Sequence, residues 1–323
     1  MHAELHRLVL QTDTDPECPT DELEEVAIHA FEVFERTSDQ LGFARSWHAL
    51  AEVHLTHCRW DNATEALERA LPHAELAGEQ GQVTQIFTYL ANAIFWGPTP
   101  VAEGLRRVEE IQARAQGHRI VEANVLCYLA GFMAMEGRSD EARALYARGR
   151  AIFEELGHTS GLAAHRLLSG LVELLLGDPH AAERELRSGC EQLEAMGETG
   201  ILSSLVAFLA EALLLQNRLE EALRATQVSE GASSADDVAS NAAWRATRAK
   251  VLARSGQWAA AVALADEAVT LAETTDHLNL QGDALRALGD VLRVRGEPKA
   301  AAAALPERPI ATNARGTSPR SQP

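Results

Sequence analysis

The sequence predicts an all-α solenoid of about seven helix hairpins, each close to 40 residues long, and two observations support this prediction. Alanine and leucine dominate long stretches, and no period-two run of β-branched residues bounded by hairpin turns occurs. Turn-forming residues recur at intervals close to 40, at Cys58, Gly97, Gly137, Gly177, Asn217, Gly256 and Gly296. Five of these seven turn positions are glycine in a chain with only 22 glycines, so chance explains the spacing poorly.

Small residues flank the turn positions at fixed distances. Alanine lies five residues beyond each one, at Ala63, Ala102, Ala142, Ala182, Ala222, Ala261 and Ala301. Seven residues before most of them lies another small residue, at Ala51, Ala130, Gly170, Ala210, Ala249 and Gly289, with Leu90 as the exception. A second series of breaks follows at Gly78, Gly117, Gly157, Gly197 and Asp237. Each unit is therefore a hairpin of closely packed helices, which buries its apolar face only by stacking on its neighbours.

The helices can be assigned in chain order. A short first helix is expected within 3–11, followed by an acidic connector with proline and a second helix over 21–35. The central segments 141–157 and 181–197 place apolar residues at the i, i+3, i+4 spacing of one buried helix face. The last helix begins as "PKAAAAAL" and meets two prolines.

These assignments divide the chain into three parts: an N-terminal segment over 1–19, the solenoid over 20–305 and a polar tail over 306–323 that is expected to be disordered. Neither end of the solenoid carries a good capping helix. Two interpretations stay open: a shortened gene product, or ends that dock on another molecule.

The turn "FWGPTP" (95–100) shows how the repeats change direction. Gly97 is expected in the left-handed conformation that ends a helix, Thr99 as the N-cap and Pro100 as the first residue of the next helix. The same order of residue types recurs in Gly177–Asp178–Pro179 and Gly296–Glu297–Pro298.

Composition narrows the function. The net charge of −18 argues against nucleic acid as a partner, because a phosphate-binding surface needs clustered Lys and Arg. Only two of the 29 basic residues are lysine, Lys250 and Lys299, which we interpret as GC-rich coding and a bacterial source. No signal peptide or stretch of membrane-spanning length is found, so a cytoplasmic protein without membrane association is expected.

No motif with catalytic chemistry occurs. The sequence lacks a phosphate-binding loop, GxGxxG, HExxH and GxSxG, and "GHTSG" (157–161) lies in an inter-repeat turn without a strand. The four cysteines are far apart, which argues against a zinc site or a disulfide framework. The best metal candidate is the group His54, His57, Cys58 and Asp61, which lacks a further convergent ligand. We therefore expect no enzyme, no cofactor and no metal site.

The spacing of small residue, turn glycine and alanine resembles the tetratricopeptide repeat (TPR). The matching residues are Trp47, Leu50, Ala51, Ala63 and Ala70 in the first full repeat and Leu126, Leu129, Ala130, Gly137 and Ala142 in the third. The ordinary repeat has about 34 residues, so longer helices are expected here. The resemblance implies a right-handed α-solenoid.

The longer repeat is similar to the superhelical regions of bacterial signal-transduction ATPases, including the maltose-regulator type. "IFWGPTPVAEGLRRVEEI", "EGRSDEARALYARGRAIFEELG" and "DHLNLQGDALRALGDVL" resemble the C-terminal TPR regions of bacterial proteins that join a class III adenylate cyclase domain to an ATPase module. This resemblance covers roughly 20–305. No cyclase or ATPase domain is present in the sequence, and the last helix ends early.

In TPR folds the first helices of the hairpins line a concave surface, and the resemblance implies which residues line it here. The N-terminal end of this groove would hold Arg45, His48 and Glu52. The apolar middle would hold Phe87, Ile94, Phe95, Met135, Leu167, Leu171, Leu174 and Leu214. The C-terminal end would hold Lys250, Arg254, Arg286 and Arg293, beside Asp283 and Asp290. The alternative is that the longer helices shift the register, which would make the leucines core residues.

The resemblance favours a non-enzymatic scaffold for protein–protein interaction, as the regulatory or sensory part of a bacterial signal-transduction system. The expected partner is a protein or peptide segment with an apolar centre and an acidic end. A cyclase or ATPase module and self-association through the solenoid ends are candidates. The alternative function is a sensor that binds a small molecule or peptide in the apolar central groove.

Overall fold

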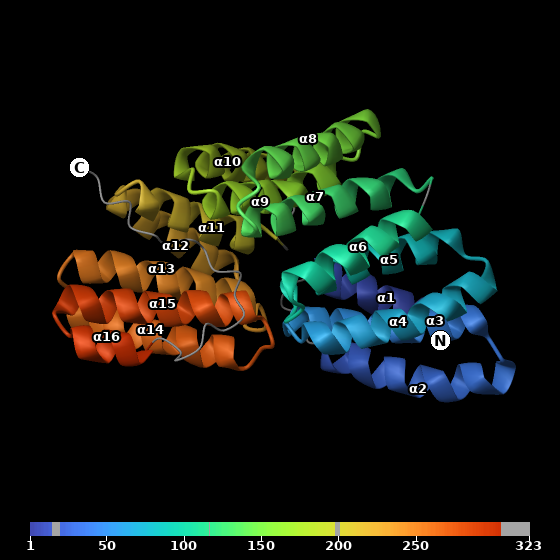
Figure 1. Cartoon of the computed structure of the whole chain (residues 1–323). Helices are drawn as coiled ribbons and strands as arrows, with labels where there is room; N and C mark the ends of the chain where they lie inside the picture. The colour runs from blue at the N-terminus through green and yellow to red at the C-terminus, as the bar shows by residue number, and fades with distance from the viewer. Residues whose placement is uncertain (15–19, 116, 198–200, 305–323) are drawn as a thin grey trace.

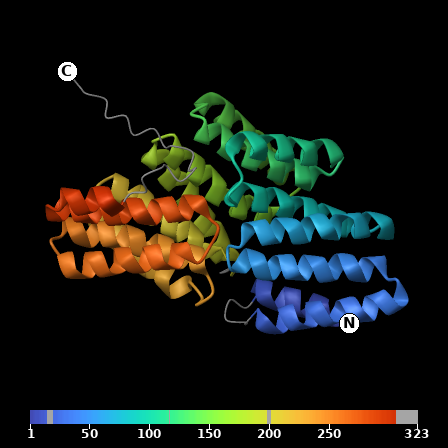
Figure 2. The ribbon, with the colours of Figure 1, turned by 60° about the horizontal axis from the view of Figure 1, so that its bottom comes forward.

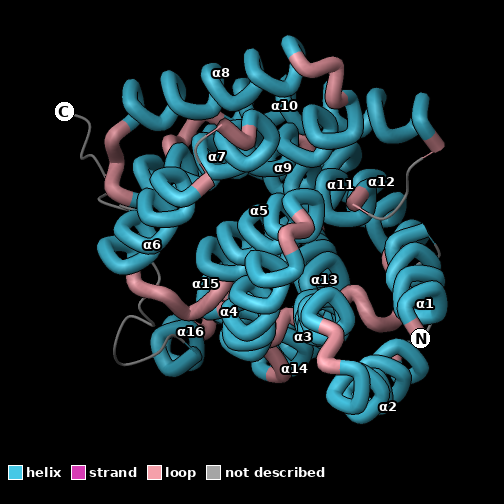
Figure 3. The backbone as a smooth tube through the Cα atoms, turned by 90° about the vertical axis from the view of Figure 1, so that its right-hand side faces the viewer, coloured by secondary structure: helices cyan, strands magenta, loops and turns pink. Residues whose placement is uncertain are grey.

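The computed structural model describes residues 1–14, 20–115, 117–197 and 201–304, and within these ranges the chain forms only helices, joined by short turns (Figures 1 and 3). The first eight helices are α1 (His2–Thr14), α2 (Asp21–Thr37), α3 (Gln40–Thr56), α4 (Trp60–Ala77), α5 (Gln80–Trp96), α6 (Val101–Arg114), α7 (Arg119–Met135) and α8 (Ser139–Glu155). The remaining helices are α9 (Thr159–Leu175), α10 (Pro179–Met196), α11 (Leu202–Leu215), α12 (Leu219–Ala232), α13 (Val238–Arg254), α14 (Trp258–Glu273), α15 (Leu278–Arg295) and α16 (Pro298–Ala304).

Consecutive helices pair into hairpins, from α1–α2 to α15–α16, and the hairpins stack in chain order (Figures 1 and 2). This confirms the all-α solenoid. The leading helix α1 packs on α2 and α3 through the buried side chains of Leu5 and Leu8. The predicted tail at 306–323 lies outside the described residues. No helix in the described part of the chain has both the length and the apolar character needed to cross a bilayer.

The turn positions have the backbone that the sequence predicts, with one exception. Six of the seven have positive φ: Cys58 (51°), Gly137 (74°), Gly177 (80°), Asn217 (61°), Gly256 (76°) and Gly296 (94°). Of the second series, the four glycines also have positive φ, whereas Asp237 caps α13 by accepting a hydrogen bond from Ser240 N at 3.0 Å. The regular spacing of turn residues in the sequence therefore corresponds to a regular spacing of left-handed turns in the backbone.

Gly97 is the exception, and the expectations for its turn are wrong. Its φ is −73° and its ψ is −179°, so it is extended rather than left-handed. Pro100 occupies the N-cap position and α6 begins at Val101, so Thr99 is not the cap. A Cβ on Gly97 would lie 2.7 Å from the carbonyl oxygen of Ala93 and 3.0 Å from the Cβ of Trp60. Glycine is required here by a close approach. In contrast, α10 begins at Pro179 behind an Asp178 cap, as expected.

The predicted small residues lie where the hairpin helices meet. The alanines that are completely buried include Ala51, Ala63, Ala130, Ala142, Ala182, Ala210, Ala222, Ala249 and Ala261. Gly170 serves the same purpose, because a Cβ there would come within 2.5 Å of Leu186 Cγ. Ala102 is exposed, and it belongs to the same hairpin as the exceptional Leu90 and Gly97. The α5–α6 hairpin is thus the divergent member of the series.

Candidate functional site

The first helices of the hairpins form the inner layer of the solenoid. Successive first helices pack on one another from α3 to α15, whereas each second helix packs on its own partner and on the next first helix. A stack whose neighbours touch more closely on one side curves toward that side. The first helices are therefore on the inside of the curve, which is where the sequence places the candidate groove.

The predicted groove residues divide into two groups. Seven are buried in the core: His48, Phe87, Ile94, Phe95, Leu171, Leu174 and Leu214. Six are partly exposed, namely Arg45, Glu52, Met135, Leu167, Lys250 and Arg286, and Arg254 and Arg293 are exposed.

The apolar middle expected for the groove is largely core. Thirteen of the 17 residues of α7 are buried, because α5, α8 and α9 surround this helix. Phe95 packs its ring against Tyr128 and Phe132, at centroid distances of 5.5 and 5.2 Å. The alternative is that the longer helices turn these side chains into the core, and six of the eight middle residues are buried in this way. Met135 and Leu167 are the two that reach the surface in part.

The charged end of the predicted groove forms a connected row on α11, α13 and α15, which we call the inner charged row (Glu211, Lys250, Arg254, Asp283 and Arg286). Glu211 accepts hydrogen bonds from Lys250 Nζ at 2.5 Å and from Thr247 Oγ1 at 3.1 Å. Arg286 pairs with Asp283 one turn earlier on α15. Arg254 donates to the backbone carbonyl of Leu214 at 3.3 Å rather than to a carboxylate.

Electrostatic interactions favour the ionised form of Glu211 in the inner charged row. Burial by itself would raise the pKa of Glu211, and the nearby Asp283 carboxylate acts in the same direction. The Lys250 ammonium and the Thr247 hydroxyl outweigh both effects and hold the pKa of Glu211 below its ordinary value. The row places acidic and basic side chains on three neighbouring inner helices.

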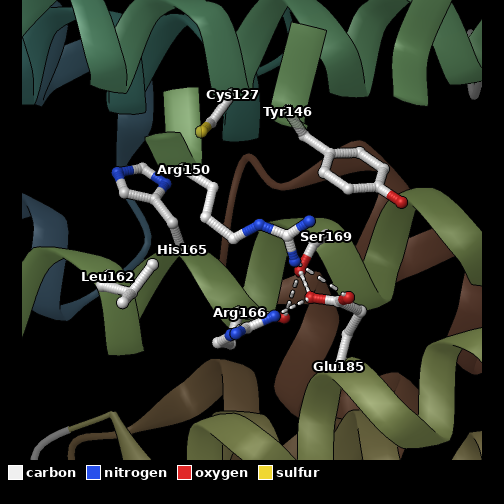
Figure 4. A pocket seen from close by; sticks show the side chains of 8 residues that line it. All are labelled: Cys127, Tyr146, Arg150, Leu162, His165, Arg166, Ser169 and Glu185. Atoms are coloured by element: carbon white, nitrogen blue, oxygen red, sulfur yellow. Dashed lines mark hydrogen bonds and ion pairs between the residues drawn. The ribbon is translucent and has the colours of Figure 1, made fainter. Parts of the chain in front are cut away.

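A separate polar cluster lies between α7, α8, α9 and α10 (Figure 4). Glu185 pairs with Arg166, accepts a hydrogen bond from Ser169 Oγ at 2.8 Å, and lies 3.4 Å from Arg150. The cavity beside them has a volume of about 10 Å³, which is room for about one water molecule. The cluster joins neighbouring hairpins and is too small to bind a substrate.

Two reactive side chains at this cluster are neutral. Burial lowers the pKa of His165 to about 4 and raises that of Cys127 to about 12. His165 Nε2 lies 2.7 Å from Asn124 Oδ1. A neutral histidine held by an amide and a protonated thiol do not form a nucleophile–base pair at neutral pH.

A larger hollow of about 300 Å³ lies along α10, α11 and α12. Its floor is apolar, with Val206, Leu209 and Leu213, and its rim carries Arg187 and Glu221. Its volume is at the lower end of those that bind small molecules. It does not include the residues that the sequence assigned to the central groove.

The metal candidate at the end of α3 consists of His54, His57, Cys58 and Asp61, and the structure does not bring these side chains together as a metal-binding group. His57 Nε2 lies 3.0 Å from Thr20 Oγ1, and Cys58 is buried. The described ranges contain no group of three or more His, Cys, Asp or Glu side chains that could hold a metal ion.

Comparisons with known proteins identify the fold. No protein-family model matches the sequence, and no curated protein matches it. The chain is similar to the crystal structure of a Rap protein complexed with competence and sporulation factor, with a TM-score of 0.69, 13% identity, and coverage of 93% of this chain and 81% of that chain. The fold is that of a TPR-like helical repeat protein.

A second similar structure is a signal transduction ATPase with numerous domains and a tetratricopeptide repeat sensor, from Pyrococcus horikoshii. It has a TM-score of 0.49 and 14% identity, with coverage of 93% of this chain and 50% of that chain. At 13% identity the comparison with the Rap structure shows the fold of the TPR-like chain and no more.

Sequence reasoning missed two lone carboxylates on the inner helices of the TPR-like stack. Glu173 lies in the apolar run "LLSGLVELLLG" and Glu211 in "LVAFLAEALLL". Glu173 is 2% exposed and accepts hydrogen bonds from Arg143 and Tyr146. A single acid inside an apolar helix is a signal that could have identified both, because a buried carboxylate requires a charged or hydrogen-bonding partner.

Proposed function

We propose that the protein is a non-enzymatic scaffold that binds a protein or peptide segment on its inner surface, at the inner charged row. The observation that supports this most is the accessibility of that row on three neighbouring inner helices, where much of the predicted apolar middle is closed by packing. TPR-like neighbours are interaction scaffolds, and the Rap structure of similar fold was solved with a factor bound.

The charges indicate the chemistry of the partner. Arg286 and Arg293 each pair with an aspartate three residues earlier, so their charges are partly compensated. Arg254 donates to a backbone carbonyl and forms no ion pair with a carboxylate among the described residues. A segment with an acidic end that reaches Arg254 fits this surface, and apolar residues next to that end would contact Met135 and Leu167.

Charge reversal tests the proposal. The variant Arg254→Glu/Arg286→Glu should weaken the binding of an acidic-ended peptide at least about tenfold, and the loss should shrink at high salt. The matched control is Arg69→Glu/Arg106→Glu, which reverses two exposed arginines on the second helices α4 and α6. Fluorescence anisotropy with peptides of acidic and scrambled charge patterns gives the affinities. If both variants bind the peptide with equal affinity, the inner charged row is not part of the binding site.

We also propose that this scaffold serves a bacterial signal-transduction system in the cytoplasm, with a cyclase or ATPase module, or a second copy of the chain, as candidate partners. The sequence resemblance to TPR regions of cyclase–ATPase proteins supports this proposal. Co-purification with the products of neighbouring genes tests it. Capture of an adjacent cyclase or ATPase that the Arg254→Glu/Arg286→Glu variant fails to retain is the expected result.

The second candidate function is a sensor of a small molecule, and the 300 Å³ hollow on α10–α12 favours it. A thermal-shift screen with lipids, peptides and nucleotides distinguishes the two functions. Val228 lines the hollow and is half exposed, so Val228→Trp should cover the hollow without disturbing the core. If Val228→Trp abolishes the thermal shift that a small molecule causes, this result supports the sensor. If the thermal shift is unchanged in the variant, the hollow is excluded as the binding site.

A further inference from the structure

Two turns that are far apart in the sequence meet in the structure. The turn between α3 and α4 contacts the loop between α14 and α15, and Figures 1 and 2 both show these ends side by side. Asp276 Oδ1 accepts a hydrogen bond from Trp60 N at 2.8 Å, and Asp276 Oδ2 accepts one from Asp61 N at 2.9 Å. Asp276 N donates to the Cys58 carbonyl oxygen at 3.3 Å. The second hairpin is thus hydrogen-bonded to the loop that precedes the last one.

Asp276 supplies the N-cap that α4 lacks. Arg59 occupies the N-cap position of α4 and makes no side-chain cap hydrogen bond. The first amides of a helix have no partner within the helix, and a carboxylate is the strongest acceptor for them. Asp178 provides such a cap locally, to Ala181 N at 2.9 Å, within a single hairpin. Asp276 makes equivalent bonds to a helix that starts 216 residues earlier.

An aromatic cluster surrounds this contact. The His277 ring lies edge-on to Trp60 at 5.8 Å and to Trp96 at 5.4 Å. Gly97 follows Trp96 and lies against Trp60, so the divergent "FWGPTP" turn is part of the same junction. The junction therefore joins the turns of two hairpins, α3–α4 and α5–α6, to the loop between α14 and α15, and it includes the exceptional Gly97.

The junction combines favourable and unfavourable contacts. The cap, the burial of the Trp60 and His277 rings and the partial burial of Trp96 favour the closed arrangement. Against this, both ring nitrogens of His277 and Nε1 of Trp60 are buried without a hydrogen-bond partner among the described residues. Each such group destabilises the closed form, since solvent would satisfy it if the junction opened. Because these stabilising and destabilising contributions oppose each other, the junction separates more easily than the continuous core between adjacent hairpins.

We propose that Asp276, His277, Trp60 and Trp96 form a latch that holds the superhelix closed, and that its release opens the solenoid without unfolding the hairpins. α15 begins directly after His277 and carries Asp283 and Arg286. Opening the latch shifts this helix relative to α3 and α5. The latch itself rests on the geometry alone; its consequence for the inner charged row rests on the proposed function.

The test compares Asp276→Ala with the matched control Asp178→Ala in the full chain without a partner. Both variants remove one aspartate cap, and only the first spans the junction. Small-angle scattering should show a larger radius of gyration for Asp276→Ala alone, with helix content unchanged by circular dichroism. Hydrogen exchange should become about five- to tenfold faster at the end of α5 and the start of α15 in Asp276→Ala only.

Asp276→Asn keeps one oxygen acceptor for the α4 amides and should remain closer to wild type in both measurements. An unchanged radius of gyration in Asp276→Ala, or an equal expansion in Asp178→Ala, would overturn the latch. Because no partner is added, failure here is distinguishable from failure of the proposed binding function.

Discussion

The ring of Phe95 on α5 fills a notch left by Gly131 on α7, where an added Cβ would come within 2.4 Å of Phe95 Cε2. A second pair packs in the same way: a Cβ on Gly104 of α6 would lie 2.5 Å from Cζ of Phe132 on α7. Large rings thus interlock with glycines on neighbouring helices. This explains how a chain with only 5% aromatic residues packs its longer helices closely.

Gly131→Ala should therefore destabilise the protein. Over-packing a filled core costs about 1–3 kcal/mol, and the gain of about 1 kcal/mol for alanine over glycine in a helix offsets part of this cost. We expect a net loss of up to about 2 kcal/mol in the free energy of unfolding, measured by urea titration. Gly231→Ala on α12 is the matched control, because its Cβ would meet no atom within 4 Å. Gly231→Ala should leave the free energy of unfolding unchanged or raise it. Equal losses of stability in both variants would contradict the close packing of Phe95 against Gly131.

A second prediction concerns the left-handed turn at Asn217. Its φ of 61° is unfavourable for residues with a Cβ, although asparagine tolerates it better than most. Asn217→Ala should lower the free energy of unfolding by about 1 kcal/mol, whereas Asn217→Gly should preserve or raise it. Thermal and urea unfolding of the pair give the comparison. If both variants lose the same stability, the asparagine side chain rather than the backbone decides this position.

The turns and their flanking small residues could be predicted because their physical requirements are local. A left-handed residue favours glycine or asparagine wherever it occurs, and closely packed helices need alanine or glycine at the contact. The position of Phe95 depends on how α5 and α7 rotate against each other, so offsets carried over from a shorter repeat placed it in the groove. The contact of Asp276 with α4 depends on the curvature of the whole stack. Neither relationship leaves a pattern in neighbouring residues.

The buried carboxylate of Glu173 provides a third prediction. Arg143 donates to its two oxygens at 3.0 and 2.6 Å, and Tyr146 donates at 2.9 Å. Arg143→Ala should destabilise the protein by about 2 kcal/mol, less than for a fully buried pair because Arg143 is 42% exposed. Adding Glu173→Leu to this variant should restore part of the loss, since the uncompensated charge is removed. Additive losses in the double variant would show that the pair is not coupled.

The last prediction is a loss of stability at mildly acidic pH. Burial lowers the pKa of His48, His165 and His277 to about 4 each. The unfolded chain binds protons at these sites below its ordinary histidine pKa of about 6.5, whereas the folded chain does so only near pH 4. The stabilisation is thus complete above pH ~6.5 and falls as the pH decreases toward 4, by up to about 3 kcal/mol per site.

Urea unfolding at several pH values between about 7 and 5 measures this slope. His165→Gln should reduce the slope by about 1.4 kcal/mol per pH unit, whatever its effect on stability at neutral pH. His29→Gln is the control, because the side chain of His29 is 61% exposed. The slope, rather than the absolute stability, separates titration from packing. An unchanged slope in His165→Gln would mean that His165 binds protons equally in the folded and unfolded chains, which contradicts a lowered pKa in the folded chain.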